Sequence, residues 1–568
     1  MNKNFFAALA LSLGAAAAAH AQNPVPSPSD RPAEALGLPP EAAAALRDID
    51  PERIRAHVRF LSDDLLEGRG TGTRGGELAA KYIATQFALY GLKPAGDHGG
   101  YFQNVNFVGV QTQPDTTFAL QPAQGDAIPL KAGDDYVTNN ASRTPVVDID
   151  APIVFVGYGI KAPEWNWDDY KGTDLRGKVL LMIVNEPTSD DPKFFNGPAL
   201  TYYGRWTYKY EEAARRGAVG ALIIHRTDLA SYPWDVVRSS WSNEQVYLAD
   251  DAAPQLEAAS WIQLEVARLL FTAAGLDLDQ EFAAANTREF KPVELPVHLV
   301  AHLVSKVRRF QSSNVLGLLP GTQAGAPRQA VIYTAHYDHL GSDPNLPGDT
   351  IYNGAVDNAT GCGILLELAR AYAYARAAQP APQPVLFAAV TAEEKGLLGS
   401  RYLGQHLPFP PARVALDLNY DAVPPIGDPQ SVTVTGAERT TFYPVVERTA
   451  QAFGLAIEPD VQPGAGHYYR SDHFSFAREG IPAFSINTGI KFAGHPPEWG
   501  KAQEDDYVAH RYHRPSDEYR PSMDFTADAK LARFGFALGW QAMTADATIG
   551  WQPGDEFEAA RQRSESSP

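Results

Sequence analysis

The sequence contains a single cysteine, Cys362, among its 568 residues. One cysteine cannot form a disulfide within the chain, and it cannot build a zinc site from thiolate ligands. Cys362 lies between two glycines at the expected start of a helix, where a small packed residue is a better interpretation than a nucleophile. The sequence therefore excludes a disulfide framework and disfavours thiol chemistry.

Positive charge is also scarce. The 48 lysines and arginines are outnumbered by 67 aspartates and glutamates, which gives a formal net charge of -19. Nucleic acids are bound through clustered lysines and arginines that neutralise phosphates, and anionic membrane surfaces also attract positive charge. We therefore expect neither nucleic acid nor a membrane surface as a partner.

Long hydrophobic runs are absent after the first residues, and no later run approaches the ~20 apolar residues that span a bilayer. Lys3 precedes the alanine-rich run Phe5–Ala19, and Ala19-His-Ala21 has the small residues of a signal-peptidase cleavage site. We predict a signal peptide over residues 1–21 and export to the periplasm or the medium of a bacterium. Nothing in the sequence indicates the oligomeric state.

The rest of the chain is long enough for two or three folding units. Residues 22–50 are rich in Pro, Ala and Ser and predict a flexible leader, and the polar residues 551–568 predict a disordered tail. Residues 111–299 carry short β-like runs that predict a β-rich inserted module. The remaining residues, 51–110 and 300–550, are expected to form one catalytic domain.

Strands alternate with helices from about Ser312 onward, which predicts an α/β fold with three layers around a mostly parallel sheet. The apolar, β-branched strand candidates and the helix candidates of this part follow the order that such a fold requires. They are the strands Ala330–Ala335, Val385–Thr391, Val414–Tyr420 and Ala483–Asn487, and the helices Gly363–Arg376 and Ala527–Ala545.

Acids and a histidine follow three of these strands. His336 comes directly after the first strand, Glu393 and Glu394 follow the second, and Asp421 ends the third. Ligands of an open parallel sheet bind outside the carboxyl ends of its strands, so these side chains are expected to meet at one edge. Asp357, in the loop before the next helix, can reach the same place.

The adjacent Glu393 and Glu394 are the sharpest local signal. Two buried carboxylates would repel each other unless a cation balanced one of them. A divalent metal on one glutamate and a polarised water near the other would explain the pair. A solvated acidic helix start is the alternative interpretation. The same ambiguity holds for His336 and for the isolated His513, neither of which identifies a site by itself.

Taken together, the motifs resemble the zinc exopeptidase family that includes bacterial leucyl aminopeptidases, glutamate carboxypeptidase and glutaminyl cyclase. The resemblance covers about residues 51–107 and 312–545, and its segments occur in the family's order. They are Asp64-Leu-Leu-Glu-Gly-Arg-Gly-Thr-Gly72, His336-Tyr-Asp338, Gly354-Ala-Val-Asp357, Thr391-Ala-Glu393-Glu394, Asn419-Tyr-Asp421, Asp472-His473-Phe474 and Tyr512-His513. The inserted module resembles a protease-associated domain, at Gly157-Tyr-Gly159 and Asp174-Leu-Arg-Gly-Lys-Val179.

The resemblance implies a role for each residue of the site. Asp357 would bridge two Zn²⁺ ions, for which Co²⁺ or Mn²⁺ could substitute. The other ligands would be His336 and Asp421 at one ion, and Glu394 and His513 at the second. Glu393 would be the general base, Asp338 would orient His336, and the neighbouring His339 is expected to point elsewhere. Asp417 lies on the same face of its strand as Asp421 and stays open as the alternative ligand.

These residues predict a secreted, two-zinc aminopeptidase that acts on peptides. Two alternatives keep the same family and change the reaction: a carboxypeptidase or a glutaminyl cyclase. The cyclase uses one zinc ion, whereas a full two-metal ligand set is present here. A peptide-binding protein without catalysis is the third interpretation, and it would require a missing ligand or base.

Overall fold

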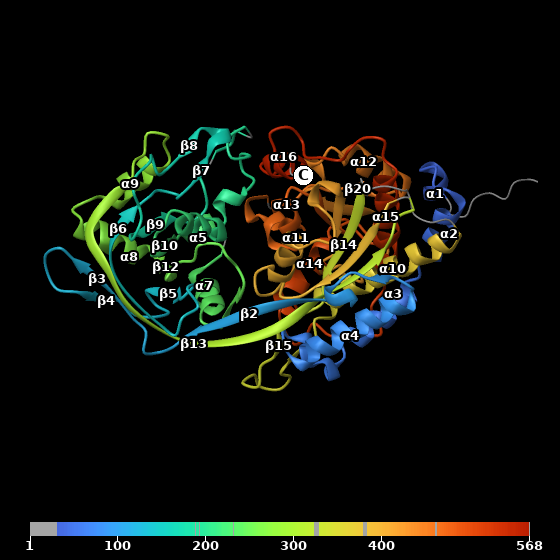
Figure 1. Ribbon diagram of the computed structural model, residues 1–568, viewed down its shortest axis with the longest axis horizontal. Coiled ribbons are helices and arrows are strands. Elements are labelled where there is room, and N and C mark those ends of the chain that lie inside the picture. The colour runs from blue at the N-terminus through green and yellow to red at the C-terminus, as the bar shows by residue number, and fades with distance from the viewer. Residues whose placement is uncertain are drawn as a thin grey trace, which may run out of the picture.

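The computed structural model describes residues 31–187, 189–191, 193–230, 232–322, 329–378, 383–460 and 463–566. The chain forms two lobes (Figure 1): the inserted module, in cyan and green, and a catalytic domain, in blue, yellow and red. The predicted signal peptide at residues 1–21 lies outside the described residues. Within those residues, no helix combines the length and the apolar character that crossing a membrane requires.

The catalytic domain is built on a central sheet whose middle strands are parallel. Strand β14 lies between β17 and β18 and runs parallel to both, and β18 also pairs in parallel with β21. Antiparallel strands flank this core, with β13 beside β17 and β19 beside β21. The strands are β1 (Lys93–Pro94), β13 (Val293–Leu319), β14 (Ala330–His336), β17 (Val385–Val390), β18 (Val414–Asn419), β19 (Ser431–Thr435), β20 (Ala456–Ile457) and β21 (Ala483–Thr488).

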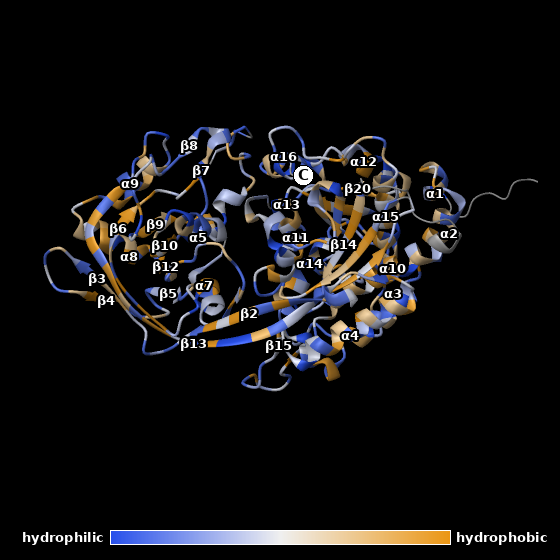
Figure 2. Ribbon diagram, viewed as in Figure 1, coloured by the Kyte–Doolittle hydropathy of each residue, from blue (hydrophilic) through white to orange (hydrophobic). Residues whose placement is uncertain are grey.

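Helices cover both faces of this sheet, because neither face of its central strands is polar. Along β14, Val331, Tyr333 and Ala335 pack into one core and Ile332 packs into another. Figure 2 shows these strands in orange between the helices. The predicted three-layer α/β fold is confirmed. The first layer contains α2 (Pro40–Asp48), α3 (Pro51–Leu61), α4 (Arg74–Leu89), α10 (Gly361–Ala378) and α15 (Thr526–Met543), and the second contains α11 (Leu398–Gln405) and α13 (His473–Arg478).

The inserted module has a sheet of its own. Strands β6, β9, β10 and β12 are parallel neighbours in that order, and β5 joins antiparallel to β12. Its helices pack on this sheet, so the module is an α/β unit rather than the β-rich one expected. The elements are β3 (Thr117–Pro122), β4 (Ile128–Pro129), β5 (Tyr136–Asn139), β6 (Val146–Phe155), β9 (Val179–Ile183), β10 (Gly220–His225), β12 (Ala258–Gln263), α5 (Trp206–Arg215), α7 (Trp234–Trp241), α8 (Leu264–Ala273) and α9 (Leu278–Ala285).

One long strand joins the two lobes. The 27 residues of β13 pair with β3 and β6 of the module in their first half and with β17 of the catalytic sheet at their end. Strand β2 (Phe102–Thr112) runs antiparallel beside it, and β11 (Gln245–Leu248) of the module pairs with β2. The boundaries expected near residues 110 and 300 therefore fall inside continuous strands.

Part of the expected flexible leader is helical. Besides α2, the helix α1 (Arg31–Ala35) lies in this segment. Ala42, Ala45, Leu46 and Ile49 are buried in the same core as α10 and α15. The prediction was wrong for the described residues from 31 on, because alanines that look like linker composition form one apolar helix face.

The predicted disordered tail is also ordered over residues 551–566, and this prediction was wrong. Trp551 and Phe557 are buried, and α16 (Glu558–Ser566) follows them. The guanidinium of Arg561 donates to the carbonyls of Pro411 and Val414. A few large anchors thus fix a segment whose overall composition is polar.

Candidate metal centre

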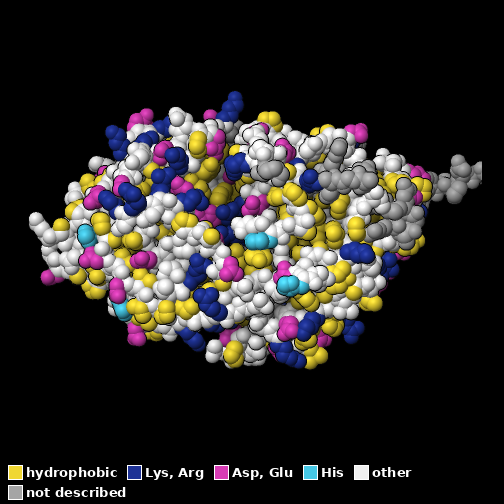
Figure 3. All heavy atoms as spheres, in the orientation of Figure 1, with side chains coloured by type: hydrophobic (Ala, Val, Ile, Leu, Met, Phe, Trp, Pro, Cys, Tyr) yellow, Lys and Arg dark blue, Asp and Glu magenta, His cyan; other side chains and the backbone are white. Residues whose placement is uncertain are grey.

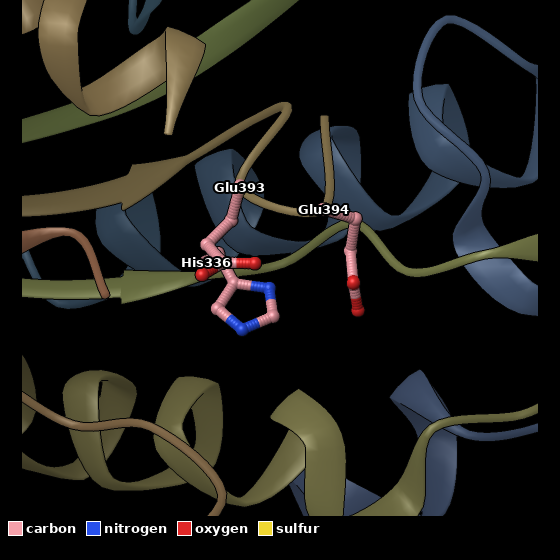
Figure 4. Close-up of side chains that lie close together, drawn as sticks. All are labelled: His336, Glu393 and Glu394. Atoms are coloured by element: carbon pink, nitrogen blue, oxygen red, sulfur yellow. The ribbon is translucent and has the colours of Figure 1, made fainter. Parts of the chain in front are cut away.

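The ends of the parallel strands place the predicted residues together. His336 is the last residue of β14, Glu393 and Glu394 follow β17, and Asp421 follows β18. Because β17 and β18 both pair with β14 in parallel, these residues lie on one edge of the sheet. In Figure 4 the carboxyl groups of Glu393 and Glu394 point to the same side, toward the level of the His336 ring.

Asp357 lies between two groups of side chains and faces each with a different oxygen. Its Oδ1 is 3.3 Å from Nε2 of His336, which is 3.2 Å from Oδ1 of Asp421. Its Oδ2 is 3.2 Å from Nε2 of His513, which is 3.3 Å from Oε2 of Glu394. The five residues predicted as ligands are therefore brought together as two histidine–carboxylate groups that share Asp357.

The donor set fits zinc in both spacing and charge. Zinc binds nitrogen and oxygen ligands at about 2.0–2.1 Å, and the corners of such a tetrahedron are about 3.3 Å apart. Burial opposes protonation of His336, yet Glu393, Asp421 and Asp357 outweigh it and raise its pKa well above the usual value. Such a buried excess of carboxylates is what divalent cations would balance.

Glu393 lies beside the group formed by His336, Asp357 and Asp421, but it is not a member of that group. Its carboxyl oxygens cluster with His336 and Glu394. Burial raises the pKa of Glu393 well above its usual value, Asp421, Glu394 and Asp472 raise it further, and His336 opposes them. A carboxyl group that takes up protons readily beside a metal site is suited to proton transfer.

The loop that carries Asp357 is held by a residue from the His513 segment. The carboxylate of Asp517 accepts the backbone N–H groups of Val356 and Asp357 at 3.0–3.2 Å. Gly354 opens this loop at φ +57°, and a Cβ there would lie 2.2 Å from the carbonyl oxygen of Asp357. Asp517 was not among the residues predicted for the site.

Arg69 connects the loop that follows His336 with the loop that carries Asp357. It is almost fully buried, and its guanidinium donates to the carbonyls of Tyr337, Asn353 and Gly354 at 2.6–2.9 Å. Burying a cation is costly unless its donors are satisfied, and these carbonyls satisfy them. The segment Asp64–Gly72 was one of the motifs that resemble the zinc exopeptidase family. These hydrogen bonds give a physical reason for the arginine in that motif.

Asp338 acts through its backbone as well as its side chain. Nδ1 of His336 is 3.1 Å from the carbonyl oxygen of Asp338, not from its carboxylate. The carboxylate instead accepts from Thr71 Oγ1 and, at 3.4 Å, from the backbone N–H of Glu393. The Asp338 carboxyl group, which was expected to orient His336, does not contact it; the carbonyl oxygen makes the contact instead, because the chain turns at the end of β14.

His339 lies in the site, and the expectation that it points elsewhere was wrong. Its Nδ1 is 2.6 Å from Oε1 of Glu394, and it clusters with Asp357 and Glu394. Side chains alternate between the two faces only along a strand, and β14 ends at His336. The direction of the His339 side chain therefore could not be predicted from alternation. Nε2 of His339 is buried and has no partner among the described residues.

Asp417, the alternative to Asp421, lies away from both histidines. Its Oδ1 accepts from Thr334 Oγ1 at 3.1 Å, and burial raises its pKa well above the usual value. Asp421, in contrast, contacts His336 and accepts a hydrogen bond from Ser471 Oγ at its second oxygen. The geometry places Asp421, and not Asp417, in the donor group.

Part of the chain is similar to known proteins. Residues 314–534 match the model of Peptidase family M28. The chain is 30% identical over 239 residues to leupeptin-inactivating enzyme 1 of Streptomyces exfoliatus, which covers 40% of this chain and 51% of that protein. It is 27% identical over 210 residues to aminopeptidase YwaD of Bacillus subtilis, or 36% of this chain and 39% of that one.

The chain thus spans about half or less of the length of these relatives. A solved aminopeptidase from Aneurinibacillus sp. strain AM-1 aligns with 88% of this chain and 96% of its own, at 19% identity and a TM-score of 0.48. The matched region of the catalytic domain contains every predicted ligand and Glu393. Over residues 314–534, the chain is therefore similar to Peptidase family M28.

Proposed function

We propose that the protein is an exported zinc aminopeptidase that removes N-terminal residues from peptides. One observation carries the proposal: Asp357 is shared by two histidine–carboxylate groups, and Glu393 lies beside them. Buried groups of this kind whose pKa values are strongly shifted are typical of catalytic sites. The match of residues 314–534 to a peptidase family supports the same reaction class.

His336 and Asp421 would hold one Zn²⁺ and Glu394 and His513 the other, with Asp357 between them. Nitrogen and oxygen donors without thiolate suit zinc, and they would also accept Co²⁺ or Mn²⁺. The bound ions would supply the Lewis acidity that makes water acidic and polarises the peptide carbonyl. His339 would hold Glu394 in place through the hydrogen bond at its other oxygen.

Glu393 is proposed to move the proton. It accepts a proton from the attacking water at its carboxylate while the water oxygen bonds to the carbonyl carbon. As the C–N bond breaks, it passes that proton to the nitrogen of the leaving amine. Burial of the Glu393 carboxyl group favours holding the proton between these two steps. Asp338 fixes the base by accepting its backbone N–H.

Aminopeptidase activity is preferred over the alternatives because one of the relatives is named an aminopeptidase. A carboxypeptidase would release residues from the other end of the peptide, and a glutaminyl cyclase would use one ion where two donor groups are present. A non-catalytic binding protein would lack a donor or the base. Export is proposed from the residues at 1–21, and the protease-associated identity of the module remains a prediction.

The test compares Glu393→Gln with the wild-type protein on leucyl-p-nitroanilide and on peptides. We expect the variant to lose about 10²–10⁴-fold in kcat, since proton transfer by a positioned side chain contributes that much, and to keep its zinc content. Glu447→Gln, an exposed glutamate on α12 (Tyr443–Ala452), is the matched control and should behave as wild type.

Mass spectrometry of the peptide products separates the alternatives. We expect the peptide to shorten from its N-terminus, N-acetylation to abolish the reaction, and C-terminal amidation to leave N-terminal release in place. Shortening from the C-terminus would identify a carboxypeptidase. Equal turnover by wild type and Glu393→Gln would contradict the role of the base.

A further inference from the structure

Residues of the module and of the catalytic domain together line a small, partly open pocket at their junction. Asn185, Arg205 and Tyr232 line it from the module, and Gly464 and Arg470 line it from the catalytic domain. A second, larger hollow shares Asn185 and Gly464 with this pocket and is also lined by Glu186 and Asp190. In Figure 3 charged side chains of both signs gather where the two lobes meet.

Two arginines, Arg205 and Arg470, line this pocket. Nε of Arg205 is buried and has no hydrogen-bond partner, and within the described part of the chain neither Arg205 nor Arg470 forms an ion pair with a carboxylate. Burial lowers the pKa of Arg205 to about 10, and the charge of Arg470 adds to that shift. A desolvated guanidinium beside a second cation is unfavourable unless an anion joins them.

Neighbouring arginines at the same junction are paired, which makes these two distinctive. Arg478 of α13 is 3.0 Å from Glu211 of α5. Arg439 is 2.8 Å from both Asp555 and Glu556. Acidic residues outnumber basic ones in this chain, which has a net charge of -19. Even so, no described acidic residue forms an ion pair with Arg205 or Arg470.

The pocket is connected to the metal centre through the chain itself. Ser471, the residue after Arg470, donates its hydroxyl to Oδ2 of Asp421 and accepts from Nδ2 of Asn419 at 2.8 Å. Tyr469, the residue before it, lies near Tyr202 of the module, with ring centroids 6.2 Å apart. Arg470 is therefore carried by a segment that contacts a metal donor on one side and the module on the other.

We propose that Arg205 and Arg470 form an anion subsite that binds a carboxylate of the peptide substrate. Guanidinium groups bind carboxylates through paired, charge-assisted hydrogen bonds, and Arg205 has an unused buried donor for one of them. The carboxylate is either an acidic side chain or the C-terminus of a short peptide. This inference rests on the proposed peptidase function and adds a substrate preference to it.

The test uses matched pairs of peptides that differ only in one carboxylate. Leu-Ala-Ala acid and its amide probe the C-terminus, and amidated Leu-Ala-Asp and Leu-Ala-Asn, with the corresponding Leu-Asp-Ala and Leu-Asn-Ala amides, probe side chains. We expect wild type to favour the carboxylate member of at least one pair by about 10–100-fold in kcat/KM, mainly through KM. The pair that responds identifies the source of the carboxylate.

Arg205→Gln and Arg470→Gln are expected to bring that ratio close to one. Arg470 is exposed, and Arg470→Glu should reverse the preference and favour a lysine peptide over its acidic counterpart. Arg176→Gln, an exposed module arginine whose partner is Asp174 at 2.8 Å, is the control and should keep the wild-type ratio. Thermal midpoints of all variants show whether the fold is retained.

A wild-type ratio near one, or a ratio that survives in the Arg470 variants, would overturn the subsite while leaving the peptidase activity on leucyl-p-nitroanilide intact. Loss of the ratio in Arg176→Gln would overturn it as well. If the wild-type protein hydrolyses none of the peptides and not the anilide, the proposed function itself fails and the subsite fails with it.

Discussion

At the scale of single residues, Asp357 connects the two donor groups, because each of its oxygens contacts a different histidine. Burial opposes ionisation of Asp357, but hydrogen bonds to His336 and His513 outweigh it and lower its pKa well below the usual value. Two neighbouring residues fix the position of Asp357. Asp517 accepts a hydrogen bond from the backbone N–H of Asp357, and Arg69 donates to the carbonyl of Gly354 earlier in the same loop.

Asp417 on β18 and Asp421 after the end of β18 have different neighbours. Replacing Asp421 by Asn removes a donor next to His336, so we expect zinc content to fall and kcat to drop by about 100-fold or more. Asp417→Asn is the matched control. Burial raises the pKa of Asp417 and so favours its neutral form, and an isosteric amide should preserve both zinc content and activity.

Metal analysis by mass spectrometry and anilide hydrolysis provide both measurements on the purified variants. The assignment of Asp421 is contradicted if Asp417→Asn loses zinc while Asp421→Asn retains it.

Residue identities in this site were predictable only where a pattern exists in the sequence. Strand ends and motif order place His336, Asp357 and Glu393–Glu394 at one edge of the sheet. His339 was missed because alternation along a strand does not extend past its last residue. The counterpart of His336 Nδ1 was also missed, since a backbone carbonyl carries no sequence signal.

At the scale of elements, the C-terminal segment is a structural part of the catalytic domain. Arg439 is buried among Asp555, Glu556 and the rings of Tyr468 and Phe557. Glu556 also accepts from Tyr469 Oη, one residue before Arg470. The segment therefore fixes the loop that leads to Ser471 and Asp421.

Deleting residues 551–568 would leave the guanidinium of Arg439 buried without its carboxylates. Breaking a buried ion pair costs about 3–5 kcal/mol, and the lost burial of Trp551 and Phe557 adds to it. We expect a clearly lower thermal midpoint of unfolding, measured by circular dichroism. The control deletion of residues 564–568 keeps Arg561 and should leave the midpoint nearly unchanged. Equal midpoints for both deletions would contradict a structural role for the tail.

The elements themselves were predicted where composition and periodicity agree. Apolar, β-branched runs gave β14, β17, β18 and β21 to within one or two residues. The leader and the tail were wrong for the opposite reason: a few buried anchors, such as Leu46 and Trp551, order segments whose average composition is that of a linker.

At the scale of the whole molecule, the module and the catalytic domain are tied together by more than a linker. The continuous β13 and its partner β2 carry backbone hydrogen bonds from one sheet toward the other. The pair Arg478–Glu211 and the pair Arg401–Asp251, at 2.9 Å, add contacts across the junction. The insertion itself could be predicted from a change of pattern, but the strand that spans it could not, because hydrophobic alternation continues through the boundary.

The central claim is that two zinc ions, held by donor groups that share Asp357, make the protein a peptidase. The most direct measurement removes metal by exhaustive chelation and then titrates zinc back while following both bound zinc and leucyl-p-nitroanilide hydrolysis. The account predicts an inactive metal-free protein and activity that rises to a plateau at two zinc ions per chain. Full activity in the chelated protein, or a plateau reached at a single ion, would contradict it.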